Sequence, residues 1–507
     1  MDTDVIKPAA THTAPRATKW RVADTVALVA LTAVSGVIRL VGLGFPSDIM
    51  FDETYYAKDA CWYAEASSSV CGIEGEQTGV HPPLGKWLLA AGIRIFGYDS
   101  FGWRVGAAVA GMLTVALLFV LARRLLKSTL GASLTAGLLA FDLLHFVQSR
   151  IAMLDVFVPL FGLAAVLFTV LDRDRLVRDG PTRGSLLARP WRLAAGLAGG
   201  AATATKWSGV LYLLLVIALT VTWETAARRE HSTTGAMGAL RRTFAEEGVS
   251  LVAWLAVAPV LLYVLTYAGR LDGSLLALPW AEGSWWRALV QKQIDAANFH
   301  LGLEATHSYQ SSPLTWIALK RPVSYYYDGD APGGVREIFA TGSPLVWWLS
   351  ALALLYTAVS WVRWRDWRGP QGVILAGFVL NYLPWILLSR GRSAVFLFYL
   401  LPSVPFMCLA LGFVATRLGR SWEARAAVAL FAAGAVASFV FYYPLLAGTT
   451  VTRDEWQDRI WVFDNCEKPV GTPSTSTITS TVDGAVETTE SVTTDNSSLP
   501  PTGWCWI

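Results

Sequence analysis

The sequence predicts an all-α polytopic membrane protein, and three observations lead to this fold class. Of its 507 residues, 54% are hydrophobic and only 16% are charged, which is more apolar surface than an ordinary soluble domain can bury. Long apolar windows recur along the chain, most of them long enough to cross a bilayer. Basic residues gather on alternate connections between these windows, as they do on the cytoplasmic side of membrane proteins. The bilayer is therefore the expected solvent for most of the chain.

Eleven apolar windows are expected to span the membrane, with the N-terminus inside. Basic clusters such as Arg123-Arg124 and Arg363-Trp364-Arg365 then lie inside. The fifth and sixth windows almost touch, and merging them would invert the orientation of everything that follows. The net charge of +3 is thus a signal of topology, and nothing in the sequence resembles a nucleic-acid module. The expected spans are 24–44, 102–122, 130–149, 153–171, 192–206, 208–223, 249–267, 343–361, 370–388, 394–416 and 426–446.

The chain divides into a membrane domain and long segments outside it. Residues 1–22 are expected in the cytoplasm before a retained signal anchor, and 23–446 form the membrane domain of a multi-pass cell-membrane protein. The long outward segments are 45–101, 268–342 and the Ser/Thr-rich tail 447–507, which has too few apolar residues to fold alone. Because the inside loops are short and basic, the chemistry is expected on the outer face. Interfacial helices are expected at 83–96 and around 284–303.

Four of the five cysteines fall in the outward segments, where thiols can oxidise. The favoured disulfides are Cys61 with Cys71 and Cys466 with Cys505, and free thiols are the alternative. The fifth cysteine, Cys408, lies within an expected span.

An acidic pair, Asp52-Glu53, stands just outside the first span, at the expected start of a short helix that also carries Tyr56. A positioned carboxylate can take the proton from a hydroxyl group as that group attacks an anomeric carbon, so the pair is a candidate general base. The alternative is structural, because the exposed amides at a helix start stabilise acidic residues. Either carboxylate could be the base.

Basic residues at the outer edges of several spans are candidates for holding a phosphate. A phosphate leaving group needs fixed positive charge, and burying such charge at a membrane edge is costly. Any one of these residues could instead reach to lipid headgroups. Asp155 follows Arg150 by five residues and could orient it, and Trp207 directly follows Lys206. The candidates are Arg39, Arg150, Lys206, Arg390 and Arg392.

Two further groups of polar residues are candidates for supporting roles. His81 and Lys86 stand on a proline-rich corner, which suits the presentation of polar groups from an interfacial helix, although His81 could be structural. Asp142 and His145 lie three apart on the third span, where one helix face would carry both. A divalent metal on the acidic pair and His81 is an alternative, but no dense ligand spacing such as HExxH or CxxC is present, so no metal is predicted.

Taken in order, four short motifs resemble those of the bacterial, actinobacterial-type protein O-mannosyltransferases. The resemblance runs from about Arg39 to the last span, and it is the combination in this order that is specific. The motifs are Phe51-Asp52-Glu53, His81-Pro82-Pro83-Leu84-Gly85-Lys86, Gln148-Ser149-Arg150 with Leu154-Asp155, and Thr205-Lys206-Trp207.

This resemblance implies a GT-C fold and an inverting transfer of mannose from polyprenyl-phosphate-mannose to Ser or Thr hydroxyls of secreted or membrane proteins. Acceptors could emerge from the secretion translocon, and no cofactor is certain. Asp52 is then the base, with Glu53 as its neighbour or substitute. The residues expected to hold the lipid phosphate are Arg150, Lys206, Arg39 and Arg392, with His81, Lys86, Asp155, Tyr56 and Trp207 in support.

The segment 268–342 is too short for the β-trefoil domain that eukaryotic members of this family carry there. Acceptor selection is therefore expected to use residues within 284–327. The candidates are His300, His307, Tyr309 and Trp316.

Rival functions stay open on the sequence alone. A related transferase would add arabinose, aminoarabinose or mannose to a glycan or lipid, and only the His81 to Lys86 motif with Lys206-Trp207 favours a protein acceptor. A transporter or flippase would gather its polar groups near the middle of the membrane, whereas here they lie at outer span ends. The tail between Thr472 and Thr494 could itself receive mannose, or it could be a flexible tether.

Overall fold

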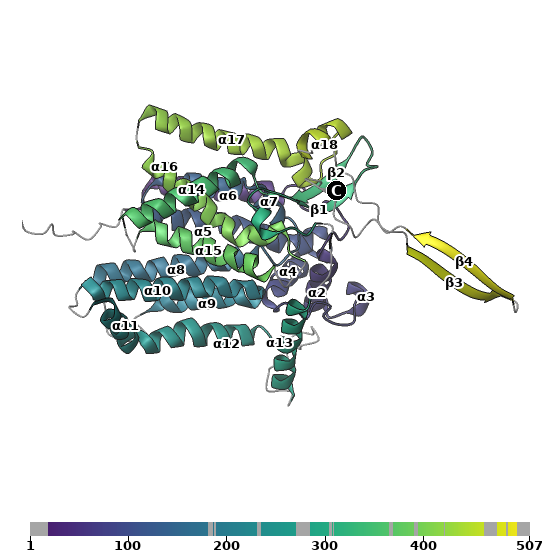
Figure 1. The fold of residues 1–507 in the computed structure, drawn as a ribbon, viewed down its shortest axis with the longest axis horizontal. Helices are drawn as coiled ribbons and strands as arrows, with labels where there is room; N and C mark the ends of the chain where they lie inside the picture. Colours follow the sequence, from purple (N-terminus) through teal and green to yellow (C-terminus); the bar gives the residue numbers. More distant parts are fainter. Residues whose placement is uncertain are drawn as a thin grey trace, which may run out of the picture.

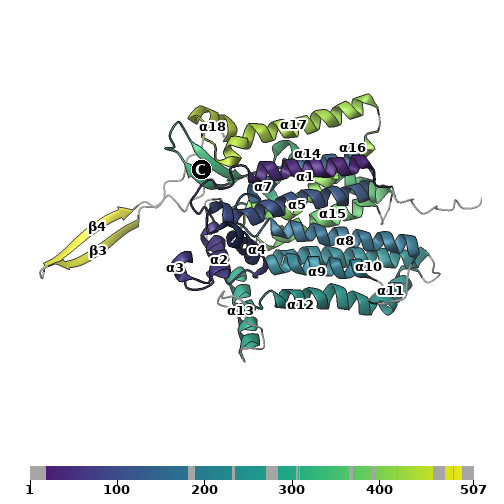
Figure 2. The same cartoon turned by 180° about the vertical axis from the view of Figure 1, so that it is seen from behind.

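The computed structural model is a bundle of long helices that run alongside one another, with shorter elements gathered at one end (Figures 1 and 2). It describes residues 19–180, 186, 189–230, 235–269, 284–303, 307, 309–364, 369–389, 394–419, 421–460, 474–482 and 485–493, with backbone alone for the last two ranges.

Eight helical stretches in the described residues are long and apolar enough to cross a membrane. One of them, Gly235–Leu265, contains a π-helical turn that joins two α-helices. The remaining three expected windows also coincide with helices, but the count of eleven spans stays a prediction because two of these helices are short and one is rich in charge toward its end. The helices of the bundle are α1 (Val22–Leu40), α5 (Ser100–Leu126), α6 (Thr129–Ala140), α8 (Phe157–Asp179), α9 (Pro190–Thr205), α10 (Val210–Glu230), α11 (Gly235–Val252), α12 (Ala258–Leu265), α14 (Pro344–Trp364), α15 (Pro370–Leu388), α16 (Val404–Arg417) and α17 (Trp422–Ala447).

The fifth and sixth windows form two separate helices, as expected. The chain leaves α9 at Lys206, whose backbone is extended, and a short 3₁₀ turn over Trp207–Gly209 leads into α10. The turn is tight enough that a Cβ on Gly209 would lie 2.2 Å from the backbone of Ala202. Glycine therefore allows the close approach that turns the chain back, and this turn places Lys206 at the end of the bundle.

The third window is not one helix, so the prediction of a continuous span over 130–149 is wrong. Helix α6 ends at Ala140, and a separate helix, α7 (Leu143–Gln148), begins after Asp142. The Asp142 side chain accepts a hydrogen bond from the backbone N–H of His145 at 2.9 Å, which is an N-cap. A short acidic side chain that caps its own backbone competes with a continuing helix. Asp142 and His145 therefore do not share one face of a spanning helix.

The segment 45–101, which was predicted to face outward, forms a small layer of helices across the end of the bundle. It contains α2 (Glu53–Glu65), α3 (Ser68–Cys71) and α4 (Leu84–Phe96), and the Cys61–Cys71 disulfide between α2 and α3 is present as expected. Buried apolar side chains of α2 and α4 pack against Trp103 of α5. Helices are present where interfacial helices were predicted, as α4 and α13 (Trp285–Leu301), and their place at the membrane surface stays a prediction. Cys408 is buried in α16, whereas Cys466 and Cys505 lie outside the described residues.

Strands were not predicted in the segments 268–342 and 447–507. β1 (Val323–Asp328) and β2 (Arg336–Ala340) form an antiparallel hairpin, and β2 lies against α17 near α18 (Arg453–Ile460). In the tail, which was predicted not to fold alone, the backbones of β3 (Ser474–Val482) and β4 (Ala485–Thr493) pair. Both regions are rich in Tyr, Thr or Val, which favour strands. The prediction considered the overall polarity of these segments and overlooked this preference.

Candidate active site

Asp52 ends the segment that connects α1 to α2 and occupies the N-cap position of α2. Phe51 before it has a left-handed backbone with a φ of 49°, which is uncommon for a residue with a side chain and turns the chain sharply into the helix. The pKa of Asp52 is raised to about 6, mainly by burial. The positive charge of Lys206 lowers this pKa, and the negative charge of Asp155 raises it further. The Asp52 side chain does not cap its own helix, so its carboxylate is left available for another partner.

Lys206 and Asp155 form an ion pair beside Asp52. The Lys206 Nζ lies 2.9 and 3.0 Å from the two carboxylate oxygens of Asp155, and it also sits 5.0 Å from the centre of the Tyr399 ring. Lys206 comes from the turn between α9 and α10, and Asp155 from the turn that precedes α8. Two chain turns and the start of α2 thus bring one cation and two carboxylates together.

Glu53, the second residue of the acidic pair, is hydrogen-bonded through both of its carboxylate oxygens. Both of its carboxylate oxygens are held by Arg104 of α5, at 2.7 and 2.8 Å, and it also accepts from the backbone N–H of Ala152 at 2.9 Å and of Met50 at 3.2 Å. Glu53 and Arg104 are fully buried. This pair fixes the start of α2 against the segment that carries Asp155. Arg104 was missed, although a lone charge in the apolar window 102–122 was a visible signal.

Arg39 and Arg150, predicted to hold the lipid phosphate, contact the end of α1 and the segments packed against it. Arg150 donates to the carbonyl oxygens of Arg39, Val41 and Gly42 at 2.7–2.9 Å, which satisfies the open end of α1. Arg39 donates to Ser35 Oγ and to the carbonyl oxygen of Ala140, and it contacts His145 Nδ1 at 2.9 Å. Both cations thereby hold α1 against α6 and α7. Arg390 and Arg392 lie outside the described residues.

Lys86 lies in a buried cluster that joins α2, α4 and α13. Its Nζ is 2.6 Å from Glu76 and 3.0 Å from Asp59, and it donates to the carbonyl oxygen of Thr78 at 2.5 Å. Glu76 also pairs with Lys292 of α13. Lys86 therefore ties α4 to α2 and, through Glu76, to α13.

A row of rings leads from the neighbourhood of Asp52 toward α9. The ring centres are 5.9 Å apart for Tyr56 and His81, 5.3 Å for His81 and His300, and 5.6 Å for His300 and Trp207. Burial raises the pKa of Tyr56, and the negative charges of Asp52 and Asp155 raise it further. His81, Tyr56 and Trp207, expected as supporting residues, are thus brought into one group with His300.

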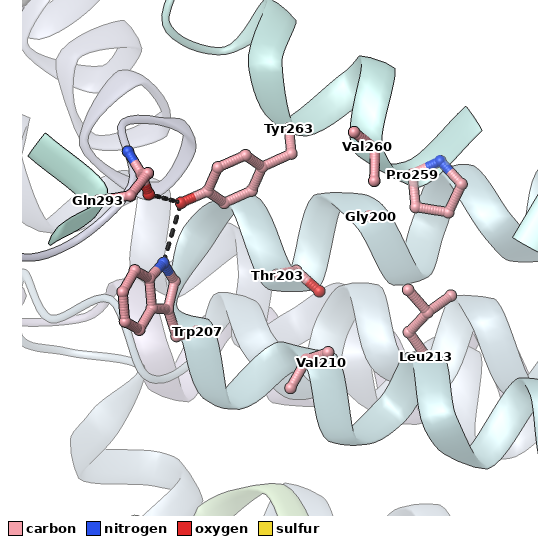
Figure 3. A pocket seen from close by; sticks show the side chains of 9 residues that line it. All are labelled: Gly200, Thr203, Trp207, Val210, Leu213, Pro259, Val260, Tyr263 and Gln293. Atoms are coloured by element: carbon pink, nitrogen blue, oxygen red, sulfur yellow. Dashed lines mark hydrogen bonds between the residues drawn. The ribbon is translucent and has the colours of Figure 1, made fainter. Parts of the chain in front are cut away.

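Trp207 also lines a pocket of about 460 Å³ between α9, α10 and α12 (Figure 3). At one end Trp207 Nε1 donates to the Tyr263 hydroxyl at 2.9 Å, and that hydroxyl donates to Gln293 Oε1 at 2.5 Å. The other walls are apolar and include Val210, Leu213 and Val260. The pocket is suited to a hydrocarbon chain whose polar end lies toward Trp207.

On another side, aromatic residues of β1 and of the segment before α16 surround Phe51. Its ring centre lies 4.7 Å from Tyr325 and 6.1 Å from Phe398 and from His307. Tyr325 accepts a hydrogen bond from Gln148 Nε2 at 2.6 Å, so β1 reaches the motif that precedes Arg150. Sequence reasoning missed Tyr325.

The acceptor-selection candidates divide. His300 belongs to the row of rings and His307 packs against Phe396 at 5.1 Å, whereas Trp316 is fully buried and cannot face an acceptor. Tyr309 is partly buried against the core beside His307. Among the described residues, no set of three or more His, Cys, Asp or Glu side chains is arranged to hold a metal.

Comparison with known proteins identifies the family. Residues 29–103 and 99–268 match the model of the dolichyl-phosphate-mannose-protein mannosyltransferases, and 285–464 match that of the C-terminal four-span region of protein O-mannosyltransferase. The chain is 32% identical to the polyprenol-phosphate-mannose–protein mannosyltransferase of Mycobacterium tuberculosis H37Rv over 85% of this chain and 90% of that one. The corresponding Corynebacterium glutamicum protein is 28% identical over 88% of this chain and 95% of its own length.

The fold is similar to that of the S. cerevisiae protein O-mannosyltransferase Pmt1-Pmt2 complex bound to its sugar donor, with a TM-score of 0.71 and 16% identity over 88% of this chain and 93% of that chain. This likeness confirms the expected GT-C fold. The family predicted from the four motifs is confirmed as well: the chain belongs to the protein O-mannosyltransferases.

Proposed function

We propose that this enzyme transfers mannose from polyprenyl-phosphate-mannose to Ser or Thr hydroxyls of polypeptides on the outer face of the membrane. The names of the M. tuberculosis and C. glutamicum relatives support the donor and the protein acceptor. The observation that carries the chemistry is the half-buried Asp52 carboxylate beside the Lys206–Asp155 pair.

Asp52 is the base in this proposal, and Glu53 positions it. As the acceptor oxygen forms its bond to the anomeric carbon, Asp52 takes the hydroxyl proton and the bond from that carbon to the phosphate oxygen breaks. The electron pair of that bond stays on the phosphate, so negative charge grows there. Attack from the side opposite the phosphate inverts the anomeric centre. Glu53 cannot share the task, because Arg104 and two backbone amides already use its oxygens.

Lys206 stabilises the departing phosphate, and Asp155 orients the Lys206 side chain. A cation placed where charge develops in the transition state contributes more in a dry site than in water. Asp155 contacts the Lys206 ammonium through both carboxylate oxygens and so fixes its position. Arg39 and Arg150 act one step away, because they set the end of α1 from which Asp52 follows.

The pocket beside Trp207 takes the hydrocarbon nearest the donor phosphate. Trp207 follows Lys206 directly, and the row of rings joins the pocket to the surroundings of Asp52. The remaining walls are apolar, as an isoprenoid chain requires. No divalent metal is assigned to the site.

The test is an assay of the purified enzyme in lipid nanodiscs with radiolabelled polyprenyl-phosphate-mannose and a Thr-containing peptide. We expect label in the peptide, joined with the anomeric configuration opposite to that of the donor. The matched control is the same peptide with Thr replaced by Ala. Label in a glycan or lipid with none in the peptide would favour the related transferase of glycans, and retained configuration would refute the direct attack.

The outward placement has its own test. Glu65 in α2 and Met237 in α11 are both exposed and lie in segments that we place on opposite sides. In a chain with Cys466→Ser and Cys505→Ser, an impermeant thiol reagent added to intact cells should label Glu65→Cys and spare Met237→Cys. The reverse pattern would put Asp52 in the cytoplasm and end the proposal.

A further inference from the structure

A buried amide near the proposed active site has an oxygen that no neighbouring group uses. Gln148, the last residue of α7, is fully buried, and its Nε2 donates a hydrogen bond to the Tyr325 hydroxyl at 2.6 Å. Within the described residues its Oε1 has no hydrogen-bond partner, although this atom is also buried. An unpaired buried acceptor destabilises a fold, so the presence of one beside an active site points to a bound group that pairs with it.

The Tyr325 hydroxyl also has bonding capacity left. It accepts from Gln148, and none of the hydrogen bonds among the described residues uses its own hydrogen. Burial raises the pKa of this phenol well above its usual value, and the negative charges of Asp155 and Asp52 raise it further. The hydroxyl therefore keeps its hydrogen at physiological pH and can donate it. Because both charges act on it, the hydroxyl lies within electrostatic reach of the two carboxylates.

Contacts from several elements hold the Tyr325 ring beside the start of α2. Its ring centre lies 4.7 Å from that of Phe51, the residue before Asp52, and 6.1 Å from that of Phe398, which precedes α16. Its hydroxyl is held by Gln148 of α7, and its backbone belongs to β1. Four parts of the chain thus fix one phenol, as a site that positions a ligand requires.

Together the two side chains offer one acceptor and one donor, which a hydroxyl group can use at the same time. Such a group donates its hydrogen to Gln148 Oε1 and accepts the hydrogen of Tyr325. The two unused atoms belong to groups that are already bonded to each other, so one hydroxyl group can meet both. The phosphate of a polyprenyl-phosphate sugar is a diester anion without a hydrogen, and it therefore has nothing to donate to Oε1.

The sugar is the part of the substrates that best fits this pair. In the proposed reaction the acceptor Ser or Thr gives its hydrogen to Asp52, so that hydrogen is not available to Gln148. The sugar lies between this acceptor and the phosphate, and therefore between Asp52 and the Lys206–Asp155 pair. A phenol within reach of both carboxylates faces the sugar, whose hydroxyl groups each offer a donor and an acceptor.

We infer that Gln148 and Tyr325 bind one hydroxyl group of the donor sugar and thereby take part in selecting mannose. This inference rests on the proposed function and adds two specificity-determining residues to it. A sugar that lacks this hydroxyl group, or that points it elsewhere, leaves buried polar atoms of the protein unpaired. Sites built to hydrogen-bond a substrate hydroxyl group reject such analogues for this reason.

The test uses the full chain in lipid nanodiscs and analogues of polyprenyl-phosphate-mannose that lack the sugar hydroxyl group at C2, C3, C4 or C6. Binding of each lipid is measured without peptide, and kcat/KM for transfer is measured with the Thr-containing peptide. We expect the parent to bind one analogue about tenfold or more weakly than the mannosyl lipid. In Tyr325→Phe this penalty should shrink to about twofold or less, because the lost hydroxyl group has lost its partner, while the other penalties stay as they were.

Tyr326→Phe is the matched control. It removes the same hydroxyl group from the next residue of β1, whose ring lies 5.5 Å from that of Phe45, and it should keep every penalty of the parent. Gln148→Met removes the amide and keeps the length of the side chain, and it should reduce the same penalty as Tyr325→Phe. A merely structural role would lower binding of all the lipids alike and would leave their ratios unchanged.

Penalties in Tyr325→Phe that equal those of the parent for every analogue would overturn the inference. So would the loss of different penalties in Tyr325→Phe and Gln148→Met. A raised KM for the peptide with unchanged donor penalties would overturn it in favour of a contact with the acceptor polypeptide. The proposed function fails on a different result, namely a parent that binds the mannosyl lipid and transfers no mannose to the peptide, so the two failures are distinguishable.

Discussion

Two groups of buried charges lie at opposite ends of α9, and they differ in how completely their charges are paired. At the end where α9 begins, three Arg and three acidic side chains hold one another in what we term the α8–α11 cluster. At the other end, Lys206 is paired with Asp155 while Asp52 stands beside them. The α8–α11 cluster consists of Asp172, Arg189, Arg192, Glu224, Arg228 and Glu247.

The difference separates charges that build the fold from charges that can react. Arg192 alone contacts Glu224 and Glu247 at 2.6 Å and Asp172 at 3.3 Å, so the cluster ties four helices together and leaves no carboxylate to spare. At the proposed active site, burial and the charges of Lys206 and Asp155 shift the pKa of Asp52, and within the described chain no hydrogen bond contributes to this shift. A carboxylate whose pKa is raised and whose oxygens are not used in ion pairs is suited to proton abstraction.

The largest effect is expected from Asp52→Asn. The amide keeps the size of the side chain but cannot take a proton, so kcat for mannosyl transfer should fall about 10²- to 10⁴-fold while the protein still folds. The same assay on Asp48→Asn, an exposed acid in the same loop, is the matched control and should show no such loss. Activity of Asp52→Asn within a few-fold of the parent would remove the base from the mechanism.

Arg192→Met should destabilise the α8–α11 cluster. It leaves the acids of the α8–α11 cluster short of one buried cation, and removing one partner of a buried ion pair typically costs about 3–5 kcal/mol. Thermal unfolding in nanodiscs should show a large drop in stability, with the protein that stays folded retaining its KM for peptide. An unchanged unfolding temperature would mean that the cluster does not hold α8–α11 together.

The pH dependence of activity tests how Lys206 and Asp155 act on the pKa of Asp52. A base must be deprotonated, so activity should rise with pH through about 6, the pKa of Asp52. Asp155→Asn removes a charge that raises this pKa and frees Lys206 to lower it, so the acidic limb should move to lower pH. Lys206→Met removes the charge that lowers the pKa, so the limb should move to higher pH. Shifts in the same direction for both variants would contradict the arrangement, since mere damage to the site has no such sign.

The sequence was sufficient for helices and family and insufficient for the use of each charge. Apolar windows located most of the long helices, and the motifs contained Asp52, Asp155 and Lys206, which the fold brings together, because these signals are local. A guanidinium at a span end looks the same whether it meets a phosphate or a helix terminus. Arg150 turned out to satisfy the carbonyls that end α1, over a hundred residues away in sequence, and no local pattern shows that.

The sequence did contain a signal for the helix break at Asp142 and for the role of Arg104, but the hydropathy of the surrounding windows outweighed it. Asp142 interrupts an apolar window, and its preference for capping a helix explains the break that hydropathy smoothed over. Arg104 was a lone charge within an apolar span, where such residues are usually functional or paired, and its partner proved to be Glu53. A charge inside a span therefore calls for a search for its partner among the nearby loop acids.

The smallest effect is expected where charges of opposite sign meet in the open. Arg124 and Asp174 are 3.4 Å apart, and their side chains are 42% and 39% exposed. Water screens such a pair and both side chains lose freedom on forming it, so Asp174→Asn should change the free energy of unfolding by no more than about 1 kcal/mol. Measured by thermal unfolding beside Arg192→Met, it tests whether burial or the mere number of ion pairs sets stability. A loss as large as that of Arg192→Met would show that the number of pairs matters, and the contrast between the two ends of α9 would then lose its physical basis.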